Sequence, residues 1–142
     1  MSAPAPAGYS GKPVWQKLGL DRTTRLLLRN APDDYAAIVG LRDADLNRVA
    51  PRAAFDVAHV FATSAAALKA GIGALAKRLP PGGVIWVSWP KKAAKVATDI
   101  IEDTVRAIAL PLGLVDVKVC AVDEVWSGLK LVWRRAHRAG KG

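Results

Sequence analysis

An apolar run over residues 84–89 (VIWVSW) constrains the fold of this chain more than any other stretch of its sequence. Two prolines and two glycines precede the run, Pro90 ends it, and three lysines follow, Lys91, Lys92 and Lys95. A run of this length between turn residues is typical of a strand that is buried on both faces of a parallel sheet. Open α/β sheets bind ligands beyond the carboxyl ends of their strands. The cationic loop after residue 89 therefore indicates where a binding site is expected.

Strand and helix patterns alternate along the rest of the chain. Strands are predicted at residues 24–29, 55–63, 84–89, 115–122 and 129–133, with a weak edge strand at 46–49. Helices are predicted at residues 12–20, 35–39, 65–79 and 99–109. Ser64 is the predicted N-cap of the third helix, and Thr98 that of the fourth. The stripe formed by Leu68, Ile72, Leu75 and Leu79 is typical of a helix that covers a sheet.

This alternation predicts a three-layer α/β sandwich with a mostly parallel, Rossmann-like sheet. The last two strands are joined by a short connection, which predicts an antiparallel hairpin at the C-terminal end. The order of the closing elements, with the segment LPPGGVIWVSWP, resembles the second half of the class I methyltransferase fold. This resemblance implies a topology and does not by itself imply an activity.

The turn after the first strand differs from that of a cofactor-binding protein. A dinucleotide or S-adenosylmethionine site needs a glycine-rich turn at this point, because only glycine lets the backbone come close to the cofactor. Residues 30–35 (NAPDDY) contain no glycine, and Pro32 removes a hydrogen-bond donor. The sequence therefore predicts no bound cofactor.

The composition agrees with one folded domain. The 142 residues are 51% hydrophobic, and 21 Lys and Arg against 12 Asp and Glu give a net charge of +9. Residues 1–10 are expected to be a disordered lead-in, residues 11–134 the domain, and residues 135–142 a basic tail. A basic excess favours anionic partners. The sequence predicts neither a secretory signal nor a membrane span, and its single cysteine, Cys120, fits a reducing compartment, so the predicted location is the cytoplasm.

The predicted topology collects polar and aromatic residues at the edge of the sheet where residues 84–89 end. The loop after residue 122 reaches this edge only if residues 115–122 run parallel to residues 84–89. The candidate site residues at this edge are then Asn30, Thr63, Trp89, Lys91, Lys92, Lys95, Asp123, Glu124 and Trp126.

Two of these groups allow a functional and a structural interpretation. The three lysines lie beside the amino end of the predicted helix 99–109, where they can bind an anionic ligand or a partner. The structural alternative is a solvated loop whose lysines neutralise nearby carboxylates. Asp123 and Glu124 beside lysines and two indoles suit acid–base chemistry, or else an ion-pair network that holds the loops together. For the carboxylates the structural interpretation is favoured.

Other reactive side chains indicate structure rather than chemistry. His59 lies in an apolar strand and His137 in the tail, without a cysteine or histidine cluster, so no metal site is predicted. Ser88 has neither a G-x-S-x-G context nor an evident histidine partner, which argues against a hydrolase triad. Cys120 is expected to be a small core residue.

Three blocks of the sequence carry a family resemblance. Residues 9–20 (YSGKPVWQKLGL), 83–99 (GVIWVSWPKKAAKVATD) and 112–130 (LGLVDVKVCAVDEVWSGLK) are similar to a small bacterial family of unknown function, number 3052. The WPKK and DEVWS motifs are the most specific parts of this resemblance. It implies a self-contained bacterial domain and supplies no catalytic residue.

The sequence therefore favours a domain without a catalytic motif that binds an anionic ligand or partner at the carboxyl edge of its sheet. Two alternatives stay open. One is a divergent S-adenosylmethionine-type transferase that uses the same edge. The other is a nucleic-acid-binding protein that uses the basic loop and the tail residues Arg134, Arg135, Arg138 and Lys141.

Overall fold

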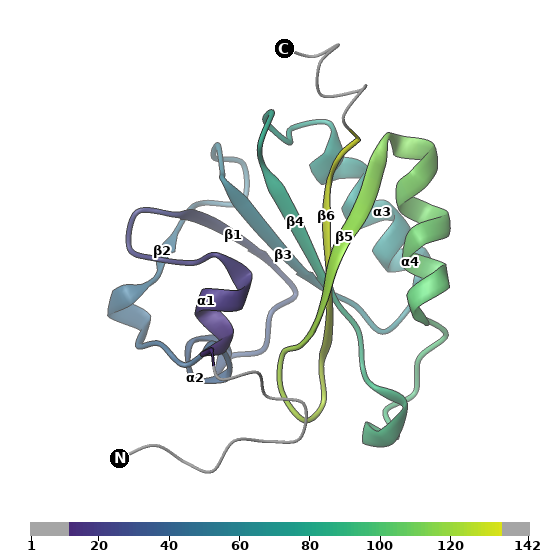
Figure 1. Ribbon diagram of the computed structural model, residues 1–142, viewed down its shortest axis with the longest axis horizontal. Coiled ribbons are helices and arrows are strands. Elements are labelled where there is room, and N and C mark those ends of the chain that lie inside the picture. Colours follow the sequence, from purple (N-terminus) through teal and green to yellow (C-terminus); the bar gives the residue numbers. More distant parts are fainter. Residues whose placement is uncertain (1–11, 135–142) are drawn as a thin grey trace.

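A computed structural model describes residues 12–134 of the chain. Its centre is a six-stranded sheet with the strand order β2-β1-β3-β4-β6-β5 (Figure 1). The strands are β1 (Arg25–Arg29), β2 (Asn47–Arg48), β3 (Val57–Phe61), β4 (Val84–Ser88), β5 (Leu114–Ala121) and β6 (Ser127–Trp133). The helices of the described residues are α1 (Val14–Leu18), α2 (Tyr35–Val39), α3 (Ala65–Ala76) and α4 (Glu102–Ala109), with the short turns η1 (Asp43–Asp45), η2 (Lys92–Ala94) and η3 (Leu110–Leu112).

The direction of the strands decides which loops can meet. β2, β1, β3 and β4 are parallel neighbours, and β6 is antiparallel to both β4 and β5. β5 therefore runs in the same direction as β4. The carboxyl ends of β1, β3, β4 and β5 consequently lie at one edge of the sheet, the carboxyl edge. This topology confirms the predicted Rossmann-like, methyltransferase-like sheet with a C-terminal antiparallel hairpin.

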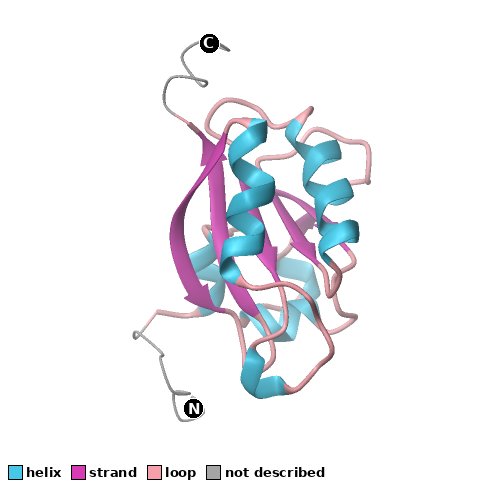
Figure 2. Ribbon diagram, turned by 90° about the vertical axis from the view of Figure 1, so that its right-hand side faces the viewer, coloured by secondary structure: helices cyan, strands magenta, loops and turns pink. Residues whose placement is uncertain are grey.

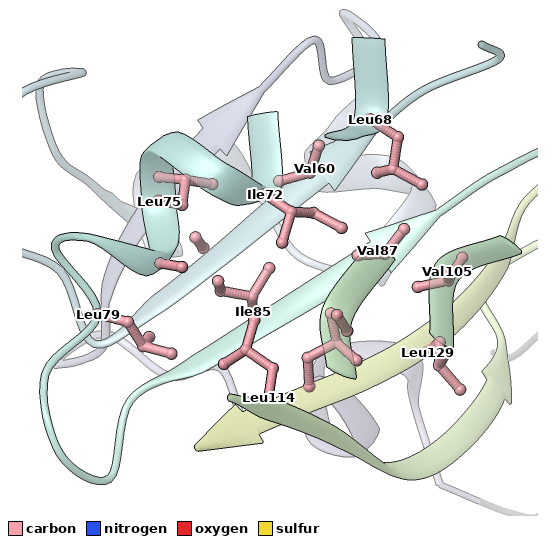
Figure 3. Packing of buried hydrophobic residues seen from close by; sticks show 14 of the residues in the cluster. Val60, Leu68, Ile72, Leu75, Leu79, Ile85, Val87, Val105, Leu114 and Leu129 are labelled. Atoms are coloured by element: carbon pink, nitrogen blue, oxygen red, sulfur yellow. The ribbon is translucent and has the colours of Figure 1, made fainter. Parts of the chain in front are cut away.

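Helices α3 and α4 lie side by side over one face of the sheet (Figure 2). The predicted stripe of α3 is confirmed, because Leu68, Ile72 and Leu75 are fully buried and Leu79, just after the helix, is 3% exposed. These side chains pack against β3 and β4, with Ile85 of β4 among them (Figure 3). Burial of one such side chain contributes about 1.5–3 kcal/mol. The larger of the two core clusters is formed on this face.

Helices α1 and α2 belong to the second core cluster, on the opposite face of the sheet. Trp86 of β4 is fully buried here, and its Nε1 donates a hydrogen bond to the carbonyl oxygen of Leu18 at 3.0 Å. Leu18 is the last residue of α1, and Gly19 follows with φ 77°, a left-handed conformation that glycine adopts without strain. The indole therefore fixes the end of α1 against the sheet.

The predicted helix 99–109 with a Thr98 cap is wrong at its start. α4 begins three residues later, and Thr98 instead donates from Oγ1 to the carbonyl oxygen of Thr63 at 2.7 Å. The carboxylate of Asp99 accepts a hydrogen bond from the backbone N–H of Ala65 at 2.7 Å. These two side chains bind the turn between β3 and α3 rather than their own helix. The segment before α4 is irregular because its polar groups are used by this neighbouring turn.

Replacement of Asp99 by alanine is expected to lower the free energy of unfolding by about 1 kcal/mol, because an N-terminal N–H group of α3 loses its acceptor. Ser64 caps the same helix end as predicted, through the N–H of Ala67 at 3.1 Å, and remains in the variant. Urea unfolding of Asp99→Ala is compared with that of Asp103→Ala, whose exposed carboxylate pairs with Arg106 at 3.1 Å. The control is expected to lose less than about 0.5 kcal/mol. An equal loss in both variants contradicts the capping role of Asp99.

Candidate functional site

The loop after β4 and the loop before β6 are hydrogen-bonded to each other at the carboxyl edge. Lys91 donates its backbone N–H to the carbonyl oxygen of Val125 at 2.7 Å. Ser127 donates its backbone N–H at 3.0 Å and its hydroxyl at 2.7 Å to the carbonyl oxygen of Trp89. The structure thus brings the start of the lysine loop and the loop over residues 123–126 together.

The two candidate indoles of this edge lie in different core clusters. Trp89 is 7% exposed and packs in the cluster under α3 and α4. Trp126 is half-buried and packs in the cluster on the α1 and α2 face, where its ring meets that of Phe61 edge to face at 5.0 Å. The residues therefore do not form one aromatic platform, and Trp89 is a core residue.

Asp123 shapes its own loop. Its Oδ1 accepts hydrogen bonds from the backbone N–H groups of Val125 at 2.9 Å and of Trp126 at 2.7 Å. Glu124 is exposed. Within residues 12–134, no ion pair joins either carboxylate to a lysine of the loop after β4. The two carboxylates therefore act as a turn-forming residue and a solvated residue in this structure.

A small hollow lies between the carboxyl ends of β1 and β3. Asn30, Thr63 and Trp126 are among the residues that line it, and its volume is about 220 Å³. The chain leaves β1 towards β2 on one side and leaves β3 towards β4 on the other, so this is a topological switch point of the sheet. Open α/β sheets bind ligands at such points. We call this space the switch-point hollow.

Aromatic side chains occupy the space beneath the switch-point hollow. Tyr35 of α2 is fully buried and meets Phe61 edge to face at 5.8 Å, on the same ring that Trp126 contacts. Asn30 has φ 56°, a left-handed conformation that asparagine adopts more readily than most residues. The glycine-free turn thus closes over an aromatic cluster, and the remaining volume is smaller than the 300–1,000 Å³, roughly, that is typical of ligand pockets.

A second hollow, of about 690 Å³, collects lysines from several segments. We call it the lysine hollow. It lies between α1, the loop after β4 and the end of β5, and none of the residues 12–134 that line it is acidic. The lining residues are Lys12, Lys17, Lys91, Lys118, Val119, Cys120, Ala121 and Ser127.

Sequence reasoning identified only part of this cationic cluster. Of the three lysines predicted for the site, Lys91 lines the lysine hollow, whereas Lys92 and Lys95 are exposed elsewhere on the loop. Lys12, Lys17 and Lys118 were missed. The parallel course of β5 and β4 could have indicated Lys118, because β5 then ends at the same edge. The position of Lys17 depends on how α1 docks, which no local pattern predicts.

Cys120 is half-buried in the wall of the lysine hollow. Burial raises the pKa of its thiol, and the positive charges of Lys17, Lys118 and Lys91 act in the opposite direction. With a raised pKa the thiol is uncharged at neutral pH. Cys120 therefore adds no negative charge to the wall.

The expectation that Ser88 has no histidine partner is wrong. Its Oγ lies 2.7 Å from Nε2 of His59, whose Nδ1 lies 2.9 Å from the hydroxyl of Tyr35. A neutral imidazole has one donor and one acceptor nitrogen, so the two hydroxyls take complementary roles. His59 also stacks on Phe61 at 4.4 Å.

This Tyr35–His59–Ser88 chain is a buried structural network. All three side chains are fully buried, so no substrate can reach the serine. Burial lowers the pKa of His59 to about 3, because the charged imidazolium is poorly solvated there. The same effect raises the pKa of Tyr35. The network therefore consists of neutral groups at neutral pH.

Two further properties concern the described part of the chain. Among residues 12–134, no group of three or more His, Cys, Asp or Glu side chains is arranged to hold a metal ion. No helix in the same residues has the length and apolar character needed to cross a membrane.

Comparison with known proteins supports the fold. The sequence matches no protein-family model and no curated protein. A protein of the NADB-Rossmann superfamily from Streptococcus agalactiae superposes with a TM-score of 0.54 over 89% of this chain and 70% of that protein, at 9% sequence identity. The ribosomal protein L11 methylase of Lactobacillus delbrueckii subsp. bulgaricus gives a TM-score of 0.46 at 12% identity, over 80% of this chain and 59% of the methylase.

The fold defines this chain as a Rossmann-like α/β domain. At such low sequence identities a structural likeness concerns the fold alone, and only the first of the two scores is high enough to support it. Membership of the bacterial family numbered 3052 stays a prediction.

Proposed function

We propose that this domain binds an anionic ligand or an acidic partner in the lysine hollow. The observation that supports this most is the meeting of Lys12, Lys17, Lys91 and Lys118 around one space, without a lining carboxylate. Like charges held together repel each other, and a bound anion relieves the repulsion. The volume of about 690 Å³ is within the range of ligand pockets.

The lysine hollow offers groups for binding rather than for catalysis. The hydroxyl of Ser127 already donates to the carbonyl oxygen of Trp89 at 2.7 Å. The pKa of the Cys120 thiol is raised, whereas a cysteine nucleophile needs a lowered one. No histidine or carboxylate that could serve as the general base is among the described residues that line the hollow. These observations support a binding module rather than an enzyme.

A divergent S-adenosylmethionine-type transferase is the alternative that the topology favours, because a hollow is present at the switch point. Its volume of about 220 Å³ argues against a nucleoside ligand, because aromatic side chains fill the space beneath it. Isothermal titration with S-adenosylmethionine and with its demethylated product tests this alternative. We expect no heat of binding at millimolar ligand. A saturable signal that Trp126→Phe or Asn30→Ala alters contradicts our preference for the lysine hollow.

Nucleic acid is a third possible anion. Of the predicted tail contacts, only Arg134 lies within the described residues, and it is exposed; Arg135, Arg138 and Lys141 lie outside them. Binding of an oligonucleotide through such residues weakens steeply with salt and is lost when residues 135–142 are deleted. Binding that survives this deletion but needs Lys91 would instead support the lysine hollow.

The proposal is tested with paired lysine variants. Lys91→Met with Lys118→Met keeps the aliphatic stems and removes two charges from the hollow. Lys92→Met with Lys95→Met removes the same charge from the same loop outside the hollow. We expect the first pair to weaken binding of inorganic tripolyphosphate about ten-fold or more, because two charge-assisted contacts are lost, and the control pair to change it less than about two-fold. Equal losses mean that only net charge matters and contradict a specific site. A large drop in melting temperature for the first pair means that these lysines are structural.

A further inference from the structure

Within residues 12–134, no strand covers the outer edge of β5. β5 is the last strand of the sheet and pairs only with β6 among the described strands. The lysine hollow is lined by four consecutive residues of β5, from Lys118 to Ala121. Successive side chains of a strand point to opposite faces, so the residues whose side chains face away from the hollow line it with their backbone. The backbone of β5 therefore borders the hollow.

The two faces of this edge differ in chemistry. Lys118 is opposite Lys130 and Cys120 is opposite Gly128, and Cys120 packs in the cluster of α1 and α2. Val119 is opposite Leu129, which belongs to the cluster under α3 and α4. Val119 is nevertheless 53% exposed. The edge thus presents lysines on one face and an exposed valine on the other.

The edge also carries a second exposed apolar residue. Val117 is 54% exposed and lies at a β-bulge, where the pairing register shifts between Asp116 and Lys118. Bulges and lysines at an edge hinder its pairing with other strands, those of a second copy included. Two copies paired through β5 would bring Lys118 and the other lysines of the hollow close to like charges, which is unfavourable. An acidic strand meets no such repulsion.

We propose that the β5 edge binds an acidic, extended peptide segment of a partner protein as an added strand. Main-chain hydrogen bonds to β5 would give affinity, and alternate side chains would give specificity, as in other β-augmentation complexes. Acidic side chains of the peptide lie on the face of β5 that carries Lys118, and the alternating apolar side chains lie beside Val119 and Val117. This inference rests on the proposed function, because it names the partner that the lysine hollow takes.

The test uses a fluorescent peptide of eight alternating glutamates and valines. Two further versions of the peptide carry N-methyl groups on all glutamate or on all valine nitrogens, so that charge is kept and one set of backbone donors is removed. We expect at least one methylated version to bind about ten-fold more weakly than the parent peptide, since strand pairing needs one of the two sets. Amide hydrogen exchange of β5 is expected to slow when the parent peptide binds.

A protein variant separates the apolar contribution from the charge. Val117→Thr keeps the branched shape of a side chain that is more than half exposed and does not line the lysine hollow, so the fold is expected to be retained. It should weaken peptide binding by about three-fold or more and leave tripolyphosphate binding unchanged. Equal binding of the parent and both methylated peptides, or no change in exchange of β5 amides, overturns the strand addition.

The proposed function and the added strand are overturned by different results. If tripolyphosphate binding depends on Lys91 and Lys118 but the peptide shows no dependence on its backbone N–H groups, only the added strand is overturned. If neither ligand depends on these lysines, the proposed function fails as well. A single-stranded oligonucleotide that binds through the same lysines, with no binding of the peptide, overturns the peptide in favour of nucleic acid.

Discussion

Replacement of Trp86 by alanine is expected to lower the free energy of unfolding by about 3–5 kcal/mol, the largest effect that we predict for a single substitution. The indole is fully buried in the central strand β4. Its loss leaves a cavity and also removes the donor of the 3.0 Å hydrogen bond to the carbonyl oxygen of Leu18. Both consequences weaken the attachment of α1 to the sheet. Denaturant unfolding with intrinsic fluorescence of the remaining tryptophans measures the effect.

Two related variants divide this effect into its parts. Trp86→Phe keeps most of the bulk but leaves the Leu18 carbonyl without its donor, and should cost about 1–3 kcal/mol. Trp126→Ala removes an indole that is only half-buried, and should cost less than Trp86→Ala. A loss below about 1 kcal/mol for Trp86→Ala contradicts the packing described here.

Acidification from pH 7.5 to pH 5 is expected to lower the free energy of unfolding by about 2 kcal/mol through His59 alone. In the folded protein, burial lowers the pKa of His59 to about 3, whereas an unfolded chain has the ordinary value of 6.5. Below pH 6.5 the imidazole of His59 binds a proton in the unfolded state but stays neutral in the folded state until the pH approaches 3. The contribution of His59 is therefore fully present above pH 6.5 and is lost progressively as the pH falls towards 3.

The measurement is a series of urea unfolding curves across this pH range. The ordinary pKa values of carboxyl groups lie below this range, and that of Asp56 is lowered further by its hydrogen bond with Arg25. His59→Gln should be less stable at pH 7.5 but nearly independent of pH. His137→Gln, which removes the only other histidine of the chain, should keep the full pH dependence. An unchanged slope in His59→Gln shows that another group is responsible.

The fold could be predicted from the sequence because its determinants are local and repetitive. The apolar run that contains Trp86 became the central strand β4, and the spacing of Leu68, Ile72 and Leu75 became the buried face of α3. The short connection before residues 129–133 correctly predicted a hairpin. The weak edge strand predicted at residues 46–49 is confirmed as the two-residue strand β2.

Features that depend on contacts between distant segments were not predictable in this way. Thr98 is a good capping residue by type, but its hydroxyl binds the carbonyl oxygen of Thr63, 35 residues earlier. His59 and Ser88 look unrelated in the sequence, and they meet only because β3 and β4 are neighbours. Trp89 follows β4 and Trp126 precedes β6, its neighbouring strand, yet the two indoles lie in different clusters.

The candidate site also has a part that the sequence predicts and a part that depends on contacts between distant segments. Its place at the carboxyl edge follows from strand direction, and Lys91 could be found there because it follows β4. The full cationic cluster needs the docking of α1, which brings Lys17 to the end of β5. That docking depends on the hydrogen bond between Trp86 and Leu18, which joins residues 68 positions apart. The sequence therefore indicated the edge but not the shape of the hollow.

A titration of isotope-labelled protein with inorganic tripolyphosphate, followed by two-dimensional NMR of backbone amides, tests the central claim most directly. We predict that the largest shifts map to the wall of the lysine hollow, at Lys17, Lys91 and the end of β5 from Lys118 to Ala121. Lys91→Met with Lys118→Met should abolish these shifts. Shifts that centre instead on Asn30 and Thr63 at the switch-point hollow, or that spread over all surface lysines alike, would contradict the account.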